Sequence, residues 1–70
     1  MSDQLPYYKI EAMIKERQLI EMYIAANLLH LTNQEARQLI KYGALRAVSY
    51  RGRLYIYTSE IKRYKEKRER

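Results

Sequence analysis

The chain has 70 residues, no cysteine and a formal net charge of +6, so we expect one domain over residues 1–70, near the lower size limit for an unaided hydrophobic core. Disulfides and cysteine-ligated zinc are excluded, and a single histidine cannot build a His-rich metal site. No apolar run approaches the roughly 18 residues of a membrane span, and the first residues lack the layout of a signal peptide. We therefore expect a cytoplasmic protein with no membrane partner, no metal and no cofactor.

Catalytic residues are not expected either. The only glycines are Gly43 and Gly52, which excludes a glycine-rich phosphate loop. Carboxylates such as Glu60 and Glu66 have no nucleophile partner in the sequence pattern. The sequence therefore predicts a protein that is not an enzyme.

Positive charge is concentrated in the second half of the chain. Residues 1–35 contain three Lys or Arg against five Asp or Glu, whereas residues 36–70 contain eleven against three. A small domain with one basic half has the electrostatic character of a protein that binds a polyanion. Nucleic acid is the commonest such partner and an anionic membrane surface the second; a basic, solvated surface without a partner is the alternative that charge alone leaves open.

In chain order, the first predicted element is helical. Residues 7–26 contain neither glycine nor proline and consist mostly of good helix formers, and Pro6 suits the first turn of a helix. Apolar side chains at helical spacing form two successive sets, which are Tyr7, Ile10, Met13 and Ile14, then Ile20, Tyr23, Ile24 and Leu28. No helix breaker separates the sets, so the sequence leaves open whether residues 7–29 form one helix or two that join near residues 18–19.

The next predicted helix has a clear start and a clear stop. Residues 32–35 have the layout of a capping box, in which the Thr32 hydroxyl accepts from the backbone N–H of Glu35 while the Glu35 carboxylate accepts from that of Thr32. Gly43 stands where a left-handed helix end is expected. These signals predict a helix over residues 32–42. Its apolar face is formed by Ala36, Leu39 and Ile40.

After this helix the pattern changes to that of strands. Residues 47–50 and 53–57 are rich in β-branched and aromatic side chains. The pair Arg51-Gly52 between them predicts a tight hairpin in which Gly52 has a positive φ. The side chains predicted to share a strand face are Val48 with Tyr50, and Leu54 with Ile56.

A last helix is predicted after the hairpin. Thr58-Ser59 is a helix-capping pair, and Ile61 and Tyr64 then form a narrow apolar stripe. The charged residues 65–70 are expected to fray into solvent.

Three short motifs follow one another in the second half of the chain, and they are Leu39-Ile40-Lys41-Tyr42-Gly43-Ala44-Leu45, Arg51-Gly52-Arg53 and Ser59-Glu60-Ile61. In this order and spacing, the chain from Ala25 to Tyr64 resembles the MerR-like, excisionase-type winged helix-turn-helix DNA-binding domain. The resemblance implies a fold that is mainly α with a small β-hairpin, in which residues 20–64 form the winged-helix core. Residues 7–19 are then an extra N-terminal helical extension and residues 65–70 a basic tail.

The chain departs from the family pattern at two places. The turn between the first two family helices usually carries glycine, and this chain has His30 there. No Ser or Thr cap stands at Ile20-Glu21, where the family's first helix begins. The missing cap suggests that this helix is extended backwards by residues 7–19.

The resemblance implies that residues 32–42 form a recognition helix that enters the major groove of double-stranded DNA. Asn and Gln side chains have the chemistry to bind adenine and Arg to bind guanine through paired hydrogen bonds, whereas Lys41 and Thr32 are suited to phosphate. The expected DNA-binding residues of this helix are Thr32, Asn33, Gln34, Arg37, Gln38 and Lys41. The alternative is that they form an ordinary solvated face.

The resemblance also implies that the hairpin acts as a wing against DNA through Arg51, Gly52 and Arg53. Two guanidinium groups at a tight turn are suited to a backbone or a narrowed minor groove; charge that only keeps a hairpin tip soluble is the alternative. The additional phosphate contacts expected are Tyr42, Arg46, Lys62 and Arg63.

The apolar residues of the N-terminal segment, Tyr7, Ile10, Met13 and Ile14, have two alternative roles. They cover the core of their own chain, or they form the surface of a homodimer or of a cooperative assembly on adjacent sites. The resemblance thus implies a sequence-preferring binder of double-stranded DNA in a bacterial, archaeal or phage-infected cell, either a small excisionase-like architectural factor or a transcriptional regulator of a mobile element. The alternative is a protein-interaction module on the same scaffold that acts on a recombinase, a polymerase or a packaging enzyme.

Overall fold

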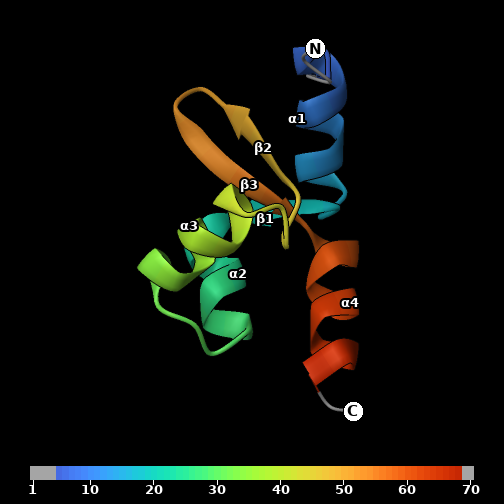
Figure 1. Cartoon of the computed structure of the whole chain (residues 1–70). Coiled ribbons are helices and arrows are strands. Elements are labelled where there is room, and N and C mark those ends of the chain that lie inside the picture. The colour runs from blue at the N-terminus through green and yellow to red at the C-terminus, as the bar shows by residue number, and fades with distance from the viewer. Residues whose placement is uncertain (1–4, 69–70) are drawn as a thin grey trace.

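A computed structural model describes residues 5–68, which form four helices and a three-stranded antiparallel sheet (Figure 1). In chain order, the elements are α1 (Tyr7–Lys15), β1 (Leu19–Glu21), α2 (Met22–Leu28), α3 (Asn33–Lys41), β2 (Ala47–Tyr50), β3 (Arg53–Tyr57) and α4 (Thr58–Arg68). The sequence predicted the hairpin of β2 and β3, but not the third strand, β1.

The first helix is shorter than the predicted extension over residues 7–19, and it is separate from α2. It ends because Arg17 has a left-handed backbone conformation, with φ of 60°. The Arg17 N–H donates to the Ile14 carbonyl at 3.1 Å, and the Gln18 N–H donates to the Met13 carbonyl at 2.8 Å. This pair of hydrogen bonds defines a Schellman helix end. The missing cap at the start of α2 thus reflects a strand that leads into that helix, not a helix extended backwards.

The next two helices end in the same way. His30 has φ of 59°, and the Leu31 N–H donates to the Ala26 carbonyl at 2.8 Å, so His30 takes the conformation that glycine usually provides. Gly43, with φ of 81°, ends α3 as predicted.

The sheet has the order β1-β3-β2, so β3 is its central strand. Ile56 of β3 lies opposite Ile20 on one side and Ala47 on the other. Both residues of the hairpin turn have positive φ, 51° at Arg51 and 76° at Gly52. Positive φ at both central positions is the type I′ geometry that matches the twist of an antiparallel pair, so the predicted hairpin and its Gly52 conformation are confirmed.

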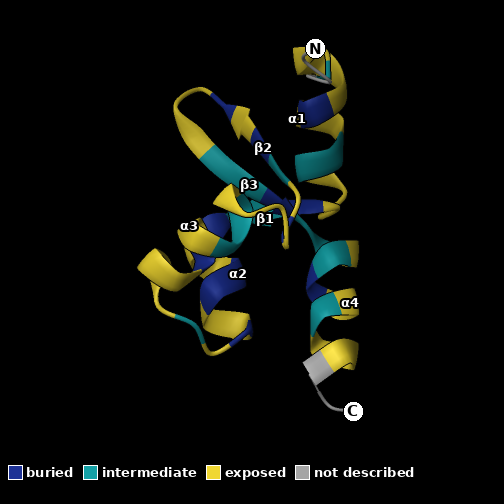
Figure 2. Cartoon of the chain, in the orientation of Figure 1, coloured by how far each residue is buried: buried dark blue, intermediate teal, exposed yellow. Residues whose placement is uncertain are grey.

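A hydrophobic cluster lies on each face of this sheet (Figure 2). The larger cluster joins the sheet to α2, α3 and α4, and its buried members are Met22, Ala25, Ala26, Leu29, Ala36, Leu45, Ile56 and Ile61. The smaller cluster joins the sheet to α1, and its buried members are Ile10, Leu19, Val48 and Tyr50. Side chains alternate between the faces of a strand, and the two predicted same-face pairs of the hairpin are confirmed, each pair facing a different cluster.

Helix α1 packs on the smaller cluster. Ile10 is fully buried there, and Met13 and Ile14 are half-buried against it. The Tyr7 ring lies edge-on to the Tyr50 ring at 5.0 Å, although Tyr7 remains 55% exposed. Ile10, Met13 and Ile14 therefore cover the core of their own chain, as the first alternative expected; the homodimer or assembly surface stays a prediction.

The predicted apolar face of α2 is wrong. Tyr23, Ile24 and Leu28 are 56%, 39% and 45% exposed, and the buried side of the helix consists instead of Met22, Ala25, Ala26 and Leu29. Both sets fit a helical period. The small alanine side chains allow α2 to lie close to its neighbours, and this packing places the bulkier set on the outside.

Helix α4 begins at Thr58, whose hydroxyl donates to the Gln18 carbonyl at 3.4 Å and whose N–H donates to it at 3.0 Å. The predicted stripe is confirmed, since Ile61 is buried and Tyr64 half-buried. The expectation of a frayed tail is wrong for residues 65–68, which continue the helix; residues 69–70 lie outside the described part of the chain.

Candidate nucleic-acid interface

The start of α3 is fixed by the predicted capping box. The Thr32 hydroxyl accepts from the Glu35 N–H at 3.1 Å, and the Glu35 carboxylate accepts from the Thr32 N–H at 2.9 Å. Two backbone donors that a helix start leaves without partners are thereby satisfied. The first turn of α3 is held in place at the protein surface.

The polar face of α3 is exposed over its whole length. Ala36 is buried, and Leu39 and Ile40 are half-buried, so these residues attach the helix to the larger cluster. The six residues predicted to bind DNA are all exposed, and they are Thr32, Asn33, Gln34, Arg37, Gln38 and Lys41. The fold thus brings amide, guanidinium and ammonium groups together on one helix face.

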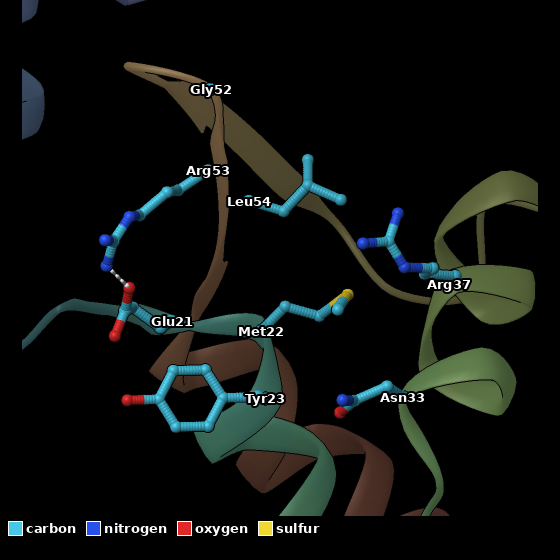
Figure 3. A pocket seen from close by; sticks show the side chains of 8 residues that line it. All are labelled: Glu21, Met22, Tyr23, Asn33, Arg37, Gly52, Arg53 and Leu54. Atoms are coloured by element: carbon cyan, nitrogen blue, oxygen red, sulfur yellow. Dashed lines mark hydrogen bonds and ion pairs between the residues drawn. The ribbon is translucent and has the colours of Figure 1, made fainter.

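A groove of about 410 Å³ separates this helix from the hairpin (Figure 3). The Asn33 and Arg37 side chains extend into it from α3, while Gly52 and Arg53 border it from the hairpin. Its lining comprises Glu21, Met22, Tyr23, Asn33, Arg37, Gly52, Arg53 and Leu54. Two predicted groups of residues, distant in sequence, therefore meet at one surface.

An ion pair crosses the edge of this groove. The Arg53 guanidinium donates to the Glu21 carboxylate at 2.6 Å, with the Arg53 side chain 68% exposed and that of Glu21 22% exposed. The hydrogen bond from Arg53 holds the pKa of Glu21 below its usual value, and the same bond raises the pKa of Arg53. Sequence analysis did not identify Glu21, because the strand that aligns it with β3 was not predicted.

The two arginines at the hairpin tip have different surroundings. Arg53 borders the groove, whereas the Arg51 guanidinium lies 5.5 Å from the centre of the Tyr50 ring. That distance is within the range of a cation–π interaction. Arg51 is exposed, but it does not line the groove with Gly52 and Arg53.

A second basic hollow, of about 280 Å³, lies between the segment that follows α3 and helix α4. Three cationic side chains, Arg46, Arg63 and Lys67, line it around Glu60. The Glu60 carboxylate accepts from the Arg46 backbone N–H at 3.3 Å and lies 3.8 Å from the Arg63 guanidinium. The fold thus brings Arg46 and Arg63 together, whereas the exposed Lys62 and Tyr42, also expected at phosphate, do not line this hollow.

A third hollow, of about 610 Å³, lies between α1 and the hairpin. Its lining includes Tyr8, Tyr50 and Tyr55 together with Ala12 and Ile14. It is therefore rich in apolar and aromatic surface, in contrast to the charged groove beside α3.

Within residues 5–68, no three His, Asp or Glu side chains gather in an arrangement that could hold a metal ion. Over the same residues, no helix has the length and apolar character needed to cross a membrane. No protein-family model, curated protein or solved structure matches the chain. The functional assignment therefore depends on the geometry and chemistry of the surface itself.

Proposed function

We propose that the chain is a non-enzymatic, sequence-preferring, double-stranded DNA-binding protein of the MerR-like, excisionase-type winged helix-turn-helix kind. The observation that carries the proposal is the groove where Asn33 and Arg37 of α3 meet Gly52 and Arg53 of the hairpin. Base-reading chemistry on one wall and a backbone-directed cation on the other are what a helix with an adjacent wing requires. The net charge of +6 supports a polyanionic partner.

In the proposed complex, α3 enters the major groove. A helix with its side chains is about 10–12 Å in diameter, which fits the roughly 12 Å width of the major groove. Arg37 binds a guanine edge, the amides of Asn33, Gln34 and Gln38 bind adenine edges, and Lys41 binds phosphate.

Cationic groups on either side of α3 then contact the two sugar–phosphate backbones that border the major groove. Arg53 and Arg51 approach the backbone beside the hairpin, and the basic hollow with Arg46 and Arg63 approaches the other. These contacts release counterions, so they contribute affinity without reading sequence. Such a protein fits the role of a small excisionase-like architectural factor or transcriptional regulator of a mobile element in the cytoplasm.

The proposal is tested by selecting the duplexes that the protein binds from a random pool. The most enriched duplex, called the selected duplex below, is then titrated by fluorescence anisotropy. We expect the affinity to fall with salt with a log–log slope on the order of several units. Arg37→Ala is expected to weaken binding to the selected duplex by about 1–3 kcal/mol with little effect on a random duplex, whereas Arg51→Ala weakens both alike. Lys9→Ala, an equal charge change at an exposed position of α1, is the matched control. No enrichment of any duplex, or equal effects of Arg37→Ala and Lys9→Ala, would contradict the proposal.

A protein-interaction module is the second candidate function, and the hollow beside α1 favours it. Tyr8 is 75% exposed at this apolar and aromatic surface, which has the composition of a protein-binding site. Light scattering separates the two candidates. A protein that stays monomeric with every duplex, yet forms a defined complex with a purified recombinase, supports the second.

A further inference from the structure

Glu21 introduces a negative charge at the edge of a surface otherwise suited to a polyanion. Its carboxylate accepts a hydrogen bond from Arg53, and this ion pair lies on the other side of the β3 ribbon from the Arg37 side chain (Figure 3). Strand pairing sets this position, because Glu21 lies opposite Tyr55, two residues along β3 from Arg53. The backbone register of the sheet therefore places Glu21 and Arg53 close enough to form this ion pair.

We propose that Glu21 is a specificity-determining residue, because it restrains Arg53 and thereby limits binding to duplexes whose bases α3 does not read. This inference rests on the proposed function and adds a residue to the same site. It assigns to β1, a strand outside the helix-turn-helix and the hairpin, a direct part in discrimination between sequences.

Glu21 restrains Arg53 in two ways: its charge partly neutralises the guanidinium, and its hydrogen bond fixes the direction in which the guanidinium points. One guanidinium nitrogen of Arg53 donates to Glu21, while a guanidinium carries five N–H donors in a rigid fork. Because the Arg53 side chain is 68% exposed, its outward donors are available to a phosphate, but only in the direction that the ion pair leaves open. In the proposed complex, the phosphate that Arg53 binds lies in that direction when α3 is in its base-reading register.

A duplex that α3 does not read is held mainly by phosphate contacts in many registers. For such a duplex, the Glu21 carboxylate competes with phosphate for Arg53 and repels nearby phosphates. Removal of the Glu21 charge therefore raises the affinity for a random duplex more than the affinity for the selected duplex. On a random duplex, Arg53 can then bind phosphate in additional positions along the DNA, whereas on the selected duplex the α3 base contacts allow only one position.

The decisive measurement compares wild type and Glu21→Gln on the selected duplex and on a random 20-bp duplex at several salt concentrations. One additional phosphate contact steepens the log–log slope by about 0.9, so the random-duplex gain is about 3.5-fold larger at 50 mM than at 200 mM salt. We expect random-duplex affinity to rise at least threefold at 50 mM salt, affinity for the selected duplex to change less than twofold, and discrimination to fall accordingly. Glu66→Gln, the same charge change at an exposed position of α4, is expected to change neither ratio.

Two further variants keep the inference falsifiable. In an Arg53→Gln background, Glu21→Gln is expected to raise random-duplex affinity no more than Glu66→Gln does, because the restrained group is gone. Glu21→Asp keeps the charge but shortens the side chain, so its carboxylate reaches Arg53 less well. We expect its affinity for the random duplex to lie between those of wild type and Glu21→Gln. If thermal melting shows that Glu21→Gln does not fold, Glu21→Asp replaces it as the test variant. Equal discrimination by wild type and the Glu21 variants overturns this inference and leaves the proposed function standing. Failure of wild type to bind any duplex overturns both.

Discussion

Replacement of Ile10 by alanine tests whether α1 is an integral part of the core. Ile10 is fully buried and is one of the four buried side chains of the smaller cluster. Truncation of a buried isoleucine to alanine destabilises proteins by about 2–5 kcal/mol. A domain of this size has a free energy of unfolding on the order of 5 kcal/mol, so a loss of about 3 kcal/mol lowers Tm by roughly 12–24 °C.

The assay is thermal unfolding followed by far-UV circular dichroism, with Tyr8→Ala as the matched control. Tyr8 belongs to the same helix but is 75% exposed, and exposed substitutions change stability by about 0.5 kcal/mol or less. We expect a large fall in Tm for Ile10→Ala and a shift of less than about 4 °C for Tyr8→Ala. If the two variants melt together, α1 is not docked on the sheet and its assignment to the core is refuted.

Three further predictions concern single contacts. Thr32→Ala removes one hydrogen bond of the capping box and is expected to lower the free energy of unfolding by about 1 kcal/mol in urea titration, whereas Thr32→Ser is expected to preserve it. Arg17→Gly relieves a left-handed conformation at φ of 60° and is expected to raise Tm by a few degrees; a fall in Tm would contradict the assigned helix end. The hydrogen bond that Tyr50 donates to Glu11 raises the pKa of Tyr50 above its usual value, so the stability that this bond contributes is full below the unfolded pKa of about 10 and is lost as the pH rises through the raised pKa. The difference in unfolding free energy between wild type and Tyr50→Phe is therefore expected to be constant from pH 7 to 9 and to shrink above pH 10.

The elements that sequence analysis predicted correctly have local chemical signals. The capping box needs only Thr32 and Glu35 at the right spacing, and the helix stop at Gly43 needs only a residue that tolerates positive φ. The hairpin likewise follows from two short strand patterns around Gly52. Each of these structures is determined by residues adjacent in sequence.

The features that were missed depend on partners distant in sequence. Arg17 ends α1 with a positive φ, which no local pattern predicts for an arginine, whereas His30 ends α2 at the position where the resembled family carries glycine. β1 has only three residues and exists through its pairing with β3, so it shows no strand period of its own. The buried side of α2 was assigned to its bulkiest apolar residues, although packing against neighbouring elements selected its alanines.

The candidate site was predictable in its parts but not in its assembly. The exposed face of α3 follows from the same period that identifies its buried residues. The placement of the hairpin beside α3 depends instead on how the sheet packs against α2 and α3. Glu21 contacts Arg53 only because β1 pairs with β3. A helical interpretation of residues 7–29 therefore could not predict this contact.

The central position of β3 connects α1 to the proposed DNA-binding surface, although α1 lies on the other face of the sheet. Ile56 anchors β3 in the larger cluster, and Tyr55 and Tyr57 anchor it against the smaller one. Without α1, the second face of this short sheet would expose apolar side chains to water, and a three-stranded sheet needs a covered hydrophobic face to be stable. Arg53 is the first residue of β3, so the position of the hairpin beside α3 depends on the packing of both faces of the sheet. The N-terminal helix therefore has a physical role in holding the hairpin in place beside α3.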